Sequence, residues 1–298
     1  TAEETPQEYI KTMKERMDTL QHRYPKNLVK QLIACFSTHT TYEGNKSQVC
    51  DVINALKTGD KRKLYWSCRN GVPKEVRAPV WYAMATSGCT YEEVITLHSH
   101  QLYNDYWNEA EDYKQFKMNP KQKRTIEVDV VRLFPEGYED VFTLDSVRER
   151  ITRLKMMYEH QFANPGYFQG MGDIIAIFFT ICYEYLLGDL TVEKYSNADK
   201  SVIDTAEAAA YVMLIYLLTN INRECPTKSD AIQFHPEALW TRILSEIKEK
   251  HLFILKDDTD IILKQQVYKL LVCFFARELT VHQSCGIYDQ LMCGTCSK

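Results

Sequence analysis

The most regular feature of this sequence is the recurrence of apolar residues at spacings of three and four, the period of an amphipathic α-helix. Gly59 follows the stripe that ends at Leu56, and a glycine is common directly after a helix C-terminus. No run alternates convincingly between apolar and polar residues, so the pattern predicts helices and not strands. The clearest stripes are Ile10, Met13, Met17 and Leu20; Val49, Val52, Ile53 and Leu56, followed by Gly59; Leu144, Val147, Ile151, Leu154 and Tyr158, with Arg148, Arg150 and Arg153 pointing elsewhere; and Leu263, Val267, Leu270, Leu271, Phe274 and Phe275.

Two further segments are apolar over most of their length and predict helices buried in the core. One runs from Ile174 to Leu187 and is interrupted by Glu184, and the other runs from Ala206 to Leu218. Both are shorter than the roughly 20 apolar residues that a helix needs to span a bilayer, so we expect no transmembrane segment. Asp204 followed by Glu207 resembles a capping box, which predicts that the second helix begins there.

Polar segments divide these helices into groups. The best candidate linkers are residues 39–47, 114–125, 189–200 and 222–230. The third linker separates an N-terminal group of helices from a C-terminal group, and we find no internal repeat or low-complexity segment. We therefore expect an all-α fold of two helical lobes.

Composition supports long helices and narrows the function. The 298 residues include only 11 glycines and 9 prolines, and 45% are hydrophobic.

A net charge of −4 gives no basic footprint for nucleic acid. Basic clusters at 61–63 and 121–124 predict solvated surface, with contact to an acidic partner or an anionic membrane as the alternative. The polar, acidic N-terminus shows no secretory signal, so we expect a soluble cytoplasmic protein.

The ten cysteines indicate packed thiols and not a disulfide scaffold. Cys35, Cys182 and Cys273 lie in apolar helical runs, where a reduced thiol packs as a small hydrophobic group. Cys293 and Cys296 have metal-site spacing, but a structural zinc site normally needs four ligands and no second pair lies nearby. We therefore expect no metal site, and a metal or redox role for this pair is the minor alternative.

Most motifs that carry chemistry are absent. The sequence has no GxxxxGK or GxGxxG phosphate loop, no HExxH and no GxSxG. A chain without a nucleotide loop can still act on a nucleotide that another protein holds. This possibility directs attention to polar residues in apolar settings, of which two segments are notable.

The first segment is Ile126–Pro135, with the sequence IEVDVVRLFP. Asp129 and Arg132 are three residues apart and are neighbours on one helical turn, so the carboxylate can orient the guanidinium. Pro135 ends that turn. Taken alone, this spacing is more typical of a surface ion pair.

The second segment is Asn164–Met171, with the sequence NPGYFQGM, directly before an apolar helix. Gln169 lies between Gly166 and Gly170, and glycine allows a partner to approach the backbone closely. Taken alone, a glutamine in such a corner is more typical of a turn residue or a helix cap.

Together with a third segment, these residues resemble the TBC-domain family of Rab GTPase-activating proteins. The segment Gly71–Trp81 (GVPKEVRAPVW) looks like the family's opening signature, the stretch Ile126–Arg132 matches its IxxDxxR motif, and Tyr167–Gly170 matches its YxQG motif. The three occur in the family's order and at about its spacing. The residues of the opening signature are Gly71, Pro73, Arg77 and Trp81, for which we expect structural roles, with the arginine stacked on the indole.

The match continues more weakly towards the C-terminus. The segment Cys273–Leu279 (CFFAREL) looks like the family's late aromatic helix, and Ile287–Asp289 looks like its hydrophobic-Trp-Asp element, with Tyr288 where Trp is usual. The resemblance thus implies a TBC domain over 60–298, with an N-terminal lobe over about 60–190 and a C-terminal lobe over about 200–298. It also implies that the C-terminal lobe is incomplete and that residues 1–59 form extension helices packed on the domain.

The resemblance implies a mechanism in trans. Arg132 would be an arginine finger and Gln169 a glutamine finger, both inserted into the site of a GTP-bound Rab GTPase. Asp129, Tyr167 and Gly170 would support these two residues. The chain would have no GTPase activity and no cofactor of its own, since Mg²⁺ and GTP are carried by the partner.

Two positions depart from the family's pattern. Leu133 stands where threonine is usual after the arginine, and Gly172 stands where asparagine is common. A pseudo-GAP that binds a Rab as a scaffold, and a helical adaptor unrelated to GTPases, are therefore kept as alternatives. Retention of both finger residues favours an active GTPase activator, cytoplasmic and compatible with peripheral recruitment to vesicle-trafficking membranes.

Overall fold

The computed structural model describes residues 46–115, 117–162, 167–224, 273–277 and 279–293. These residues form helices, turns and loops and contain no strand, so the predicted all-α class is confirmed. The helix predicted over Ile10–Leu20 and most of the extension 1–59 lie outside the described residues. The helices are α3 Lys46–Thr58, α4 Lys61–Cys68, η1 Lys74–Val76, α5 Arg77–Ala85, α6 Tyr91–Ile95, α7 His100–Asp112, η2 Tyr113–Gln115, α8 Pro120–Val131, α9 Glu139–Phe142, α10 Asp145–Gln161, α11 Met171–Leu187, α12 Val192–Asn197, α13 Lys200–Glu224 and α16 Val281–Cys293.

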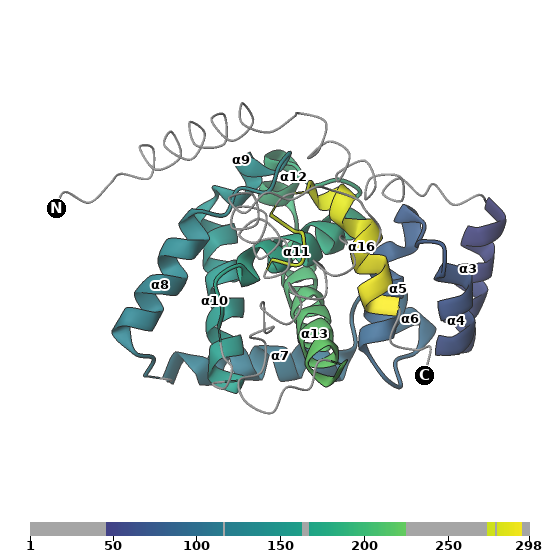
Figure 1. Ribbon diagram of the computed structural model, residues 1–298, viewed down its shortest axis with the longest axis horizontal. Coiled ribbons are helices and arrows are strands. Elements are labelled where there is room, and N and C mark those ends of the chain that lie inside the picture. Colours follow the sequence, from purple (N-terminus) through teal and green to yellow (C-terminus); the bar gives the residue numbers. More distant parts are fainter. Residues whose placement is uncertain (1–45, 116, 163–166, 225–272, 278, 294–298) are drawn as a thin grey trace, which may run out of the picture.

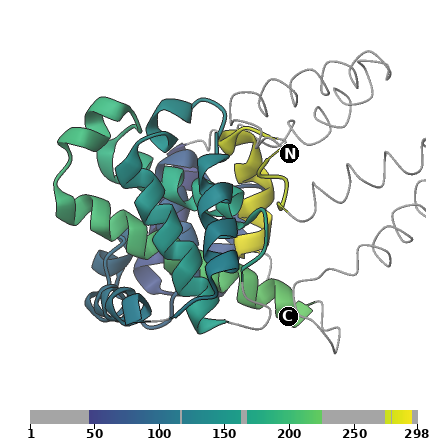
Figure 2. The same ribbon diagram turned by 90° about the vertical axis from the view of Figure 1, so that its left-hand side faces the viewer.

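The core is built around α11 and α13. Helix α11 is buried from Met171 to Tyr183 apart from Asp173, because α13, α10, α5 and α16 all pack against it. Helices α8 and α10 lie at one end of the molecule and α3 and α4 at the other (Figure 1), and the turned view keeps α16 against the body of the molecule (Figure 2). The apolar character of α11 on nearly every side therefore reflects burial on nearly every side.

Helix α13 has the length and composition of a membrane span over Lys200–Asn220, alone among the helices of the described ranges. In the most apolar 18 residues of that segment, 67% of the residues are buried inside the protein, and the helix packs on α11, α5 and α7. Core helices of this kind satisfy the same length and hydropathy criteria. The structure therefore accounts for the apolar run as part of the core.

Two of the predicted stripes are confirmed as buried helix faces. Helix α3 buries Val52 and Leu56, and Gly59 follows its end with a φ of +65°, a conformation that favours glycine. In α10 the stripe of Val147, Ile151 and Leu154 is almost completely buried. In both helices the spacing of apolar residues predicted the buried face.

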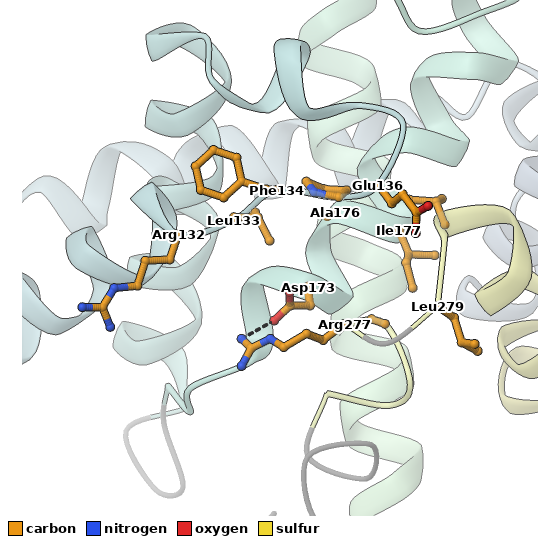
Figure 3. A pocket seen from close by; sticks show the side chains of 12 residues that line it. Arg132, Leu133, Phe134, Glu136, Asp173, Ala176, Ile177, Arg277 and Leu279 are labelled. Carbon is orange, nitrogen blue, oxygen red and sulfur yellow. Dashed lines mark hydrogen bonds and ion pairs between the residues drawn. The ribbon is translucent and has the colours of Figure 1, made fainter. Parts of the chain in front are cut away.

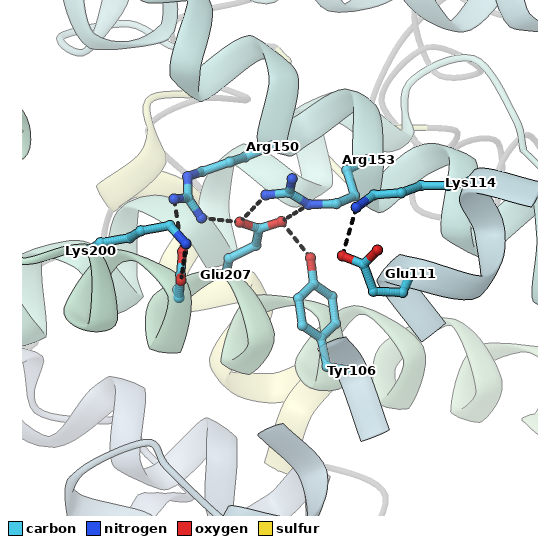
Figure 4. A network of polar contacts seen from close by, with 8 residues as sticks. Tyr106, Glu111, Lys114, Arg150, Arg153, Lys200 and Glu207 are labelled. Carbon is cyan, nitrogen blue, oxygen red and sulfur yellow. Dashed lines mark hydrogen bonds and ion pairs between the residues drawn. The ribbon is translucent and has the colours of Figure 1, made fainter. Parts of the chain in front are cut away.

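The predicted capping box at Asp204 is wrong. Helix α13 begins at Lys200, where the Asp199 carbonyl accepts the first backbone bonds, so Asp204 and Glu207 lie inside the helix. Both carboxylates instead pair with α10: Arg153 donates to Glu207 at 2.6 and 2.7 Å, and Arg150 pairs with Asp204 at 2.8 Å. Arg150 and the hydroxyl of Tyr106 on α7 also bond to Glu207, which joins three helices (Figure 4). Asp204 and Glu207 therefore form ion pairs with arginines on another helix and do not cap the helix that carries them.

The late aromatic helix is also corrected where the structure describes it. Residues 273–277 form turns, and Phe274 and Phe275 have φ values of +47° and +64°. Cys273 and Phe274 are buried. The apolar residues of this segment therefore pack in the core without forming a helix. The earlier part of that stripe, from Leu263, lies outside the described residues.

Two predicted linkers also contain helices. Within 114–125, helix α8 begins at Pro120, because the Asn119 side chain accepts from the backbone N–H of Lys121 and proline suits the first helical turn. Within 189–200, the short helix α12 is capped by the Thr191 side chain. The two-lobe division and its boundaries stay a prediction.

Candidate functional site

Arg132 lies at the C-terminal cap of α8. The helix ends at Val131, and Arg132 takes φ −90° and ψ 3°. Val130, two residues before it, and Leu133, directly after it, are buried at 2% and 4% exposure, whereas the arginine itself is exposed. The chain therefore anchors itself in the core on both sides of Arg132 and presents the guanidinium at the surface.

Gln169 lies in the turn that leads into α11. Gly170 precedes the helix with φ 108° and ψ −14°, a backbone conformation that costs a residue with a Cβ atom about 1–2 kcal/mol. Met171 follows and is completely buried, while Gln169 is exposed. The glycine thus turns the chain sharply between an exposed glutamine and a buried methionine. Of the rest of this corner, residues 163–166 lie outside the described ranges.

Asp129 joins these two segments. Its Oδ2 atom accepts a hydrogen bond from the Tyr167 hydroxyl at 2.8 Å and another from Lys155 Nζ at 2.8 Å. Asp129 is three residues before Arg132, and Tyr167 is two residues before Gln169. One carboxylate therefore holds together the segments that carry the two predicted finger residues. Burial, and secondarily Asp129, raise the pKa of Tyr167, so its hydroxyl stays a donor.

Two residues at this junction were missed by the sequence analysis. Lys155 on α10 is completely buried, and burial lowers the pKa of its ammonium while Asp129 acts against that shift. Glu159, one turn further along α10 and 6% exposed, accepts from the backbone N–H of Tyr167 at 2.5 Å and from Gln122 on α8. The sequence offered one sign of them: each is a charged residue directly after an apolar residue of the predicted α10 stripe, Leu154 or Tyr158.

A surface hollow of about 170 Å³ lies beside Arg132. Asp173 on α11 and Arg277 line it and form an ion pair at 2.6 Å, and in Figure 3 the Arg132 side chain points away from that pair. Three exposed apolar residues lie within four positions of the arginine in the sequence: Val128, Val131 and Phe134 are 39%, 39% and 40% exposed. This end of α8 thus combines one exposed guanidinium with an apolar rim.

The residues of the opening signature meet at a different carboxylate, Asp289 on α16. Its oxygens accept from Arg77 Nε at 3.1 Å and from Trp81 Nε1 at 2.9 Å. They also accept from the backbone N–H of Val72 at 3.0 Å, which follows Gly71 in its left-handed conformation. Asp289 is 1% exposed, so this is a buried clamp between the start of α5 and α16. We expected Arg77 to stack on Trp81; the contact that the structure provides is their shared bond to Asp289.

In the described ranges, no group of three or more His, Cys, Asp and Glu side chains is placed to hold a metal ion. Cys293 is buried in α16, whereas Cys296 lies outside the described residues, so the predicted lack of a role for this pair is not tested.

Comparison with known proteins relates this arrangement to one family. The sequence model of the Rab-GTPase-TBC domain matches residues 74–298. Among solved structures, the chain is similar to the Ypt/Rab-GAP domain of Gyp1p, with a TM-score of 0.58 and 17% identity over 91% of this chain and 81% of that chain. At that identity the likeness shows the fold. A search of curated protein sequences found no match.

Proposed function

Because the chain belongs to the Rab-GTPase-TBC domain family, which supports a Rab GTPase-activating role, we propose that Arg132 and Gln169 are its catalytic residues. Both act in trans on a Rab GTPase in its GTP-bound state. The observation that supports this is the Asp129–Tyr167 hydrogen bond, 2.8 Å long, which ties together the segments bearing these two exposed side chains. An exposed pair on joined segments can enter one nucleotide pocket at the same time.

The residue types suit phosphoryl transfer. Catalysis of GTP hydrolysis rests on positioning the water and on neutralising charge that spreads over the γ-phosphate and the leaving oxygen. Arg132 supplies a planar, permanently charged fork that can bond two phosphate oxygens. Gln169 can accept a hydrogen bond from the attacking water and donate another elsewhere, and so orients the water for in-line attack. Mg²⁺ and GTP belong to the partner.

The surface around Arg132 supports docking of a partner. Val128, Val131 and Phe134, all within four residues of Arg132, give this end of α8 a rim of exposed apolar area. Covering that rim with a GTPase would exclude water, which strengthens the interaction between arginine and phosphate. We therefore assign this end of α8 to the contact with the GTPase.

The test is single-turnover phosphate release from a panel of GTP-loaded Rab GTPases. Arg132→Ala is expected to lower the stimulated rate by about 10³–10⁵-fold, which is the general range for an arginine finger supplied in trans. Arg132→Lys is expected to be severely impaired as well, because lysine keeps the charge and loses the fork. Gln169→Ala should also abolish most of the stimulation. Arg124→Ala, an exposed arginine on the same helix, is the matched control and should stay near wild type.

The outcomes separate the alternatives. Loss of stimulation in both finger variants supports the proposal. A wild-type chain that binds a GTP-loaded Rab without stimulating hydrolysis would identify a pseudo-GAP scaffold, to which the departures at Leu133 and Gly172 would then contribute. A chain that binds no GTPase in the panel would refute the proposal.

Cytoplasmic location with peripheral recruitment to vesicle-trafficking membranes is part of the proposal. Trp66 on α4 is 61% exposed, and the Arg69 guanidinium lies 5.6 Å from its ring centroid. Arg62 and Lys63 are exposed on the same helix. An indole among cations suits the interface of an anionic membrane. Sedimentation with vesicles that contain phosphatidylserine should be weakened by Trp66→Ala, whereas neutral vesicles should bind neither protein.

A further inference from the structure

Lys155 is unusual because its side chain is completely buried. Lysine is almost never fully buried without a partner, since an unpaired ammonium in the interior is very costly. Its Nζ atom donates to Asp129 at 2.8 Å and lies 5.5 Å from the centroid of the Tyr167 ring. The Tyr167 hydroxyl donates to the same Asp129 oxygen. Each of the three side chains therefore contacts the other two: the ammonium of Lys155 on α10, the carboxylate of Asp129 on α8 and the phenol of Tyr167 in the Gln169 segment.

Gly172 makes the space for this ammonium. A Cβ atom at position 172 would lie 2.8 Å from Lys155 Nζ and 3.0 Å from its Cε, which is closer than ordinary packing allows. The same Cβ would lie 3.7 Å from a methyl carbon of Leu133. The two positions that depart from the family's pattern thus lie close together, since Leu133 is within contact distance of the space that a side chain at position 172 would fill, and the Lys155 ammonium now takes that space.

We propose that Lys155 is a positioning residue that sets the Arg132 segment against the Gln169 segment through Asp129, and that Gly172 is the residue that admits it. This inference rests on the proposed function. An ammonium donor at Asp129 fixes where α8 ends relative to the turn before α11. The displacement of a catalytic group by about 1 Å can cost roughly 10²-fold in rate, so a loose junction would reduce catalysis before it reduced docking.

The proposal predicts a particular pattern of compensation. Lys155→Leu removes the donor, and Gly172→Asn places a side chain where the ammonium lies, so each single variant should loosen the junction. In the double variant Lys155→Leu/Gly172→Asn, the shorter leucine leaves room for the asparagine. Its carboxamide can then donate to Asp129 in place of the ammonium. The double variant is therefore expected to recover activity that both single variants lose.

The experiment measures kcat and KM for stimulated hydrolysis by the full chain, together with thermal unfolding. Each single variant is expected to lower kcat by roughly 10²-fold while KM for the GTPase changes much less. The control is Asp204→Ala, which breaks a buried ion pair elsewhere and should lower stability without lowering kcat. A Lys155→Leu variant that keeps the wild-type kcat, or loses no more than Asp204→Ala does, would overturn the inference. A double variant no better than the single ones would overturn the pairing with Gly172.

Hydrogen–deuterium exchange provides a second measurement that needs no GTPase. Lys155→Leu should speed exchange in the peptides around Arg132 and around Gln169 together, and Asp204→Ala should speed neither. If wild type stimulates no GTPase, the proposed function fails and exchange alone decides the inference. Unchanged exchange at both segments would then refute it.

Discussion

The buried Asp289 carboxylate makes a demanding test of how this fold is stabilised. It joins residues that are more than 200 positions apart, since Arg77 Nε donates to it across a separation of 212 residues and Trp81 Nε1 across 208. Arg77 is 5% exposed and also donates to the carbonyl oxygen of Val72 at 2.8 Å. The change Asp289→Ala removes the acceptor and leaves the guanidinium in place. The perturbation is therefore an unpaired buried charge.

The magnitude follows from that charge and from the lost bonds. Removal of one partner of a buried ion pair costs about 3–5 kcal/mol, mostly because the other charge stays desolvated. The orphaned indole and Val72 donors make the upper half of that range the better expectation, since each buried unsatisfied donor costs about 1–3 kcal/mol. Domains are typically stable by about 5–15 kcal/mol, so a large share of the total is at risk.

The assay is equilibrium urea unfolding followed by far-ultraviolet circular dichroism. Asp51→Ala, which removes an exposed carboxylate on α3, is the matched control and should change the free energy of unfolding by less than about 0.5 kcal/mol. Arg77→Met and the double variant complete a thermodynamic cycle. We expect a coupling energy of about 1–3 kcal/mol, because the second change removes the charge that the first leaves unpaired.

Two results would refute this reasoning. The first is a loss below about 1 kcal/mol in Asp289→Ala, which would mean that the guanidinium reaches water after the carboxylate is removed. The second is additivity of the two single changes, which would mean that Arg77 and Asp289 do not stabilise the fold as a pair.

Three further predictions test other parts of the molecule. Glu207→Ala should lower the free energy of unfolding by about 3–5 kcal/mol in the same urea assay, because it leaves two arginines without their shared carboxylate; a loss below 1 kcal/mol would contradict it. Gly170→Ala should lower stimulated GTP hydrolysis far more than Gly88→Ala, since both glycines have positive φ but only the first adjoins Gln169. Equal effects in phosphate release would argue against that turn as a catalytic element. Burial raises the pKa of Cys182, so iodoacetamide should label the exposed Cys50 and leave Cys182 unlabelled until the chain unfolds, as peptide mass spectrometry can show.

Local pattern alone determined the parts of this protein that depend on neighbours in sequence. The spacing of Val49, Val52 and Leu56, and of the α10 stripe, predicted helices and their buried faces, because one face of a helix repeats every three or four residues. Motif order identified the segments of Arg132 and Gln169 and the family. Their catalytic roles stay predictions, because those roles depend on a pocket that another protein supplies.

The tertiary structure decided which charges meet. Lys155 and Asp129 are 26 residues apart, Tyr167 and Asp129 are 38 apart, and Glu207 is 54 from Arg153. Sequence reasoning assigned Glu207 to a cap because the local pattern of acids is the same whether they cap a helix or pair with arginines on another one. Apolar periodicity records that a face is buried and not what it is buried against. A buried ion pair depends on distance and solvent exposure, and both exist only once the helices have packed.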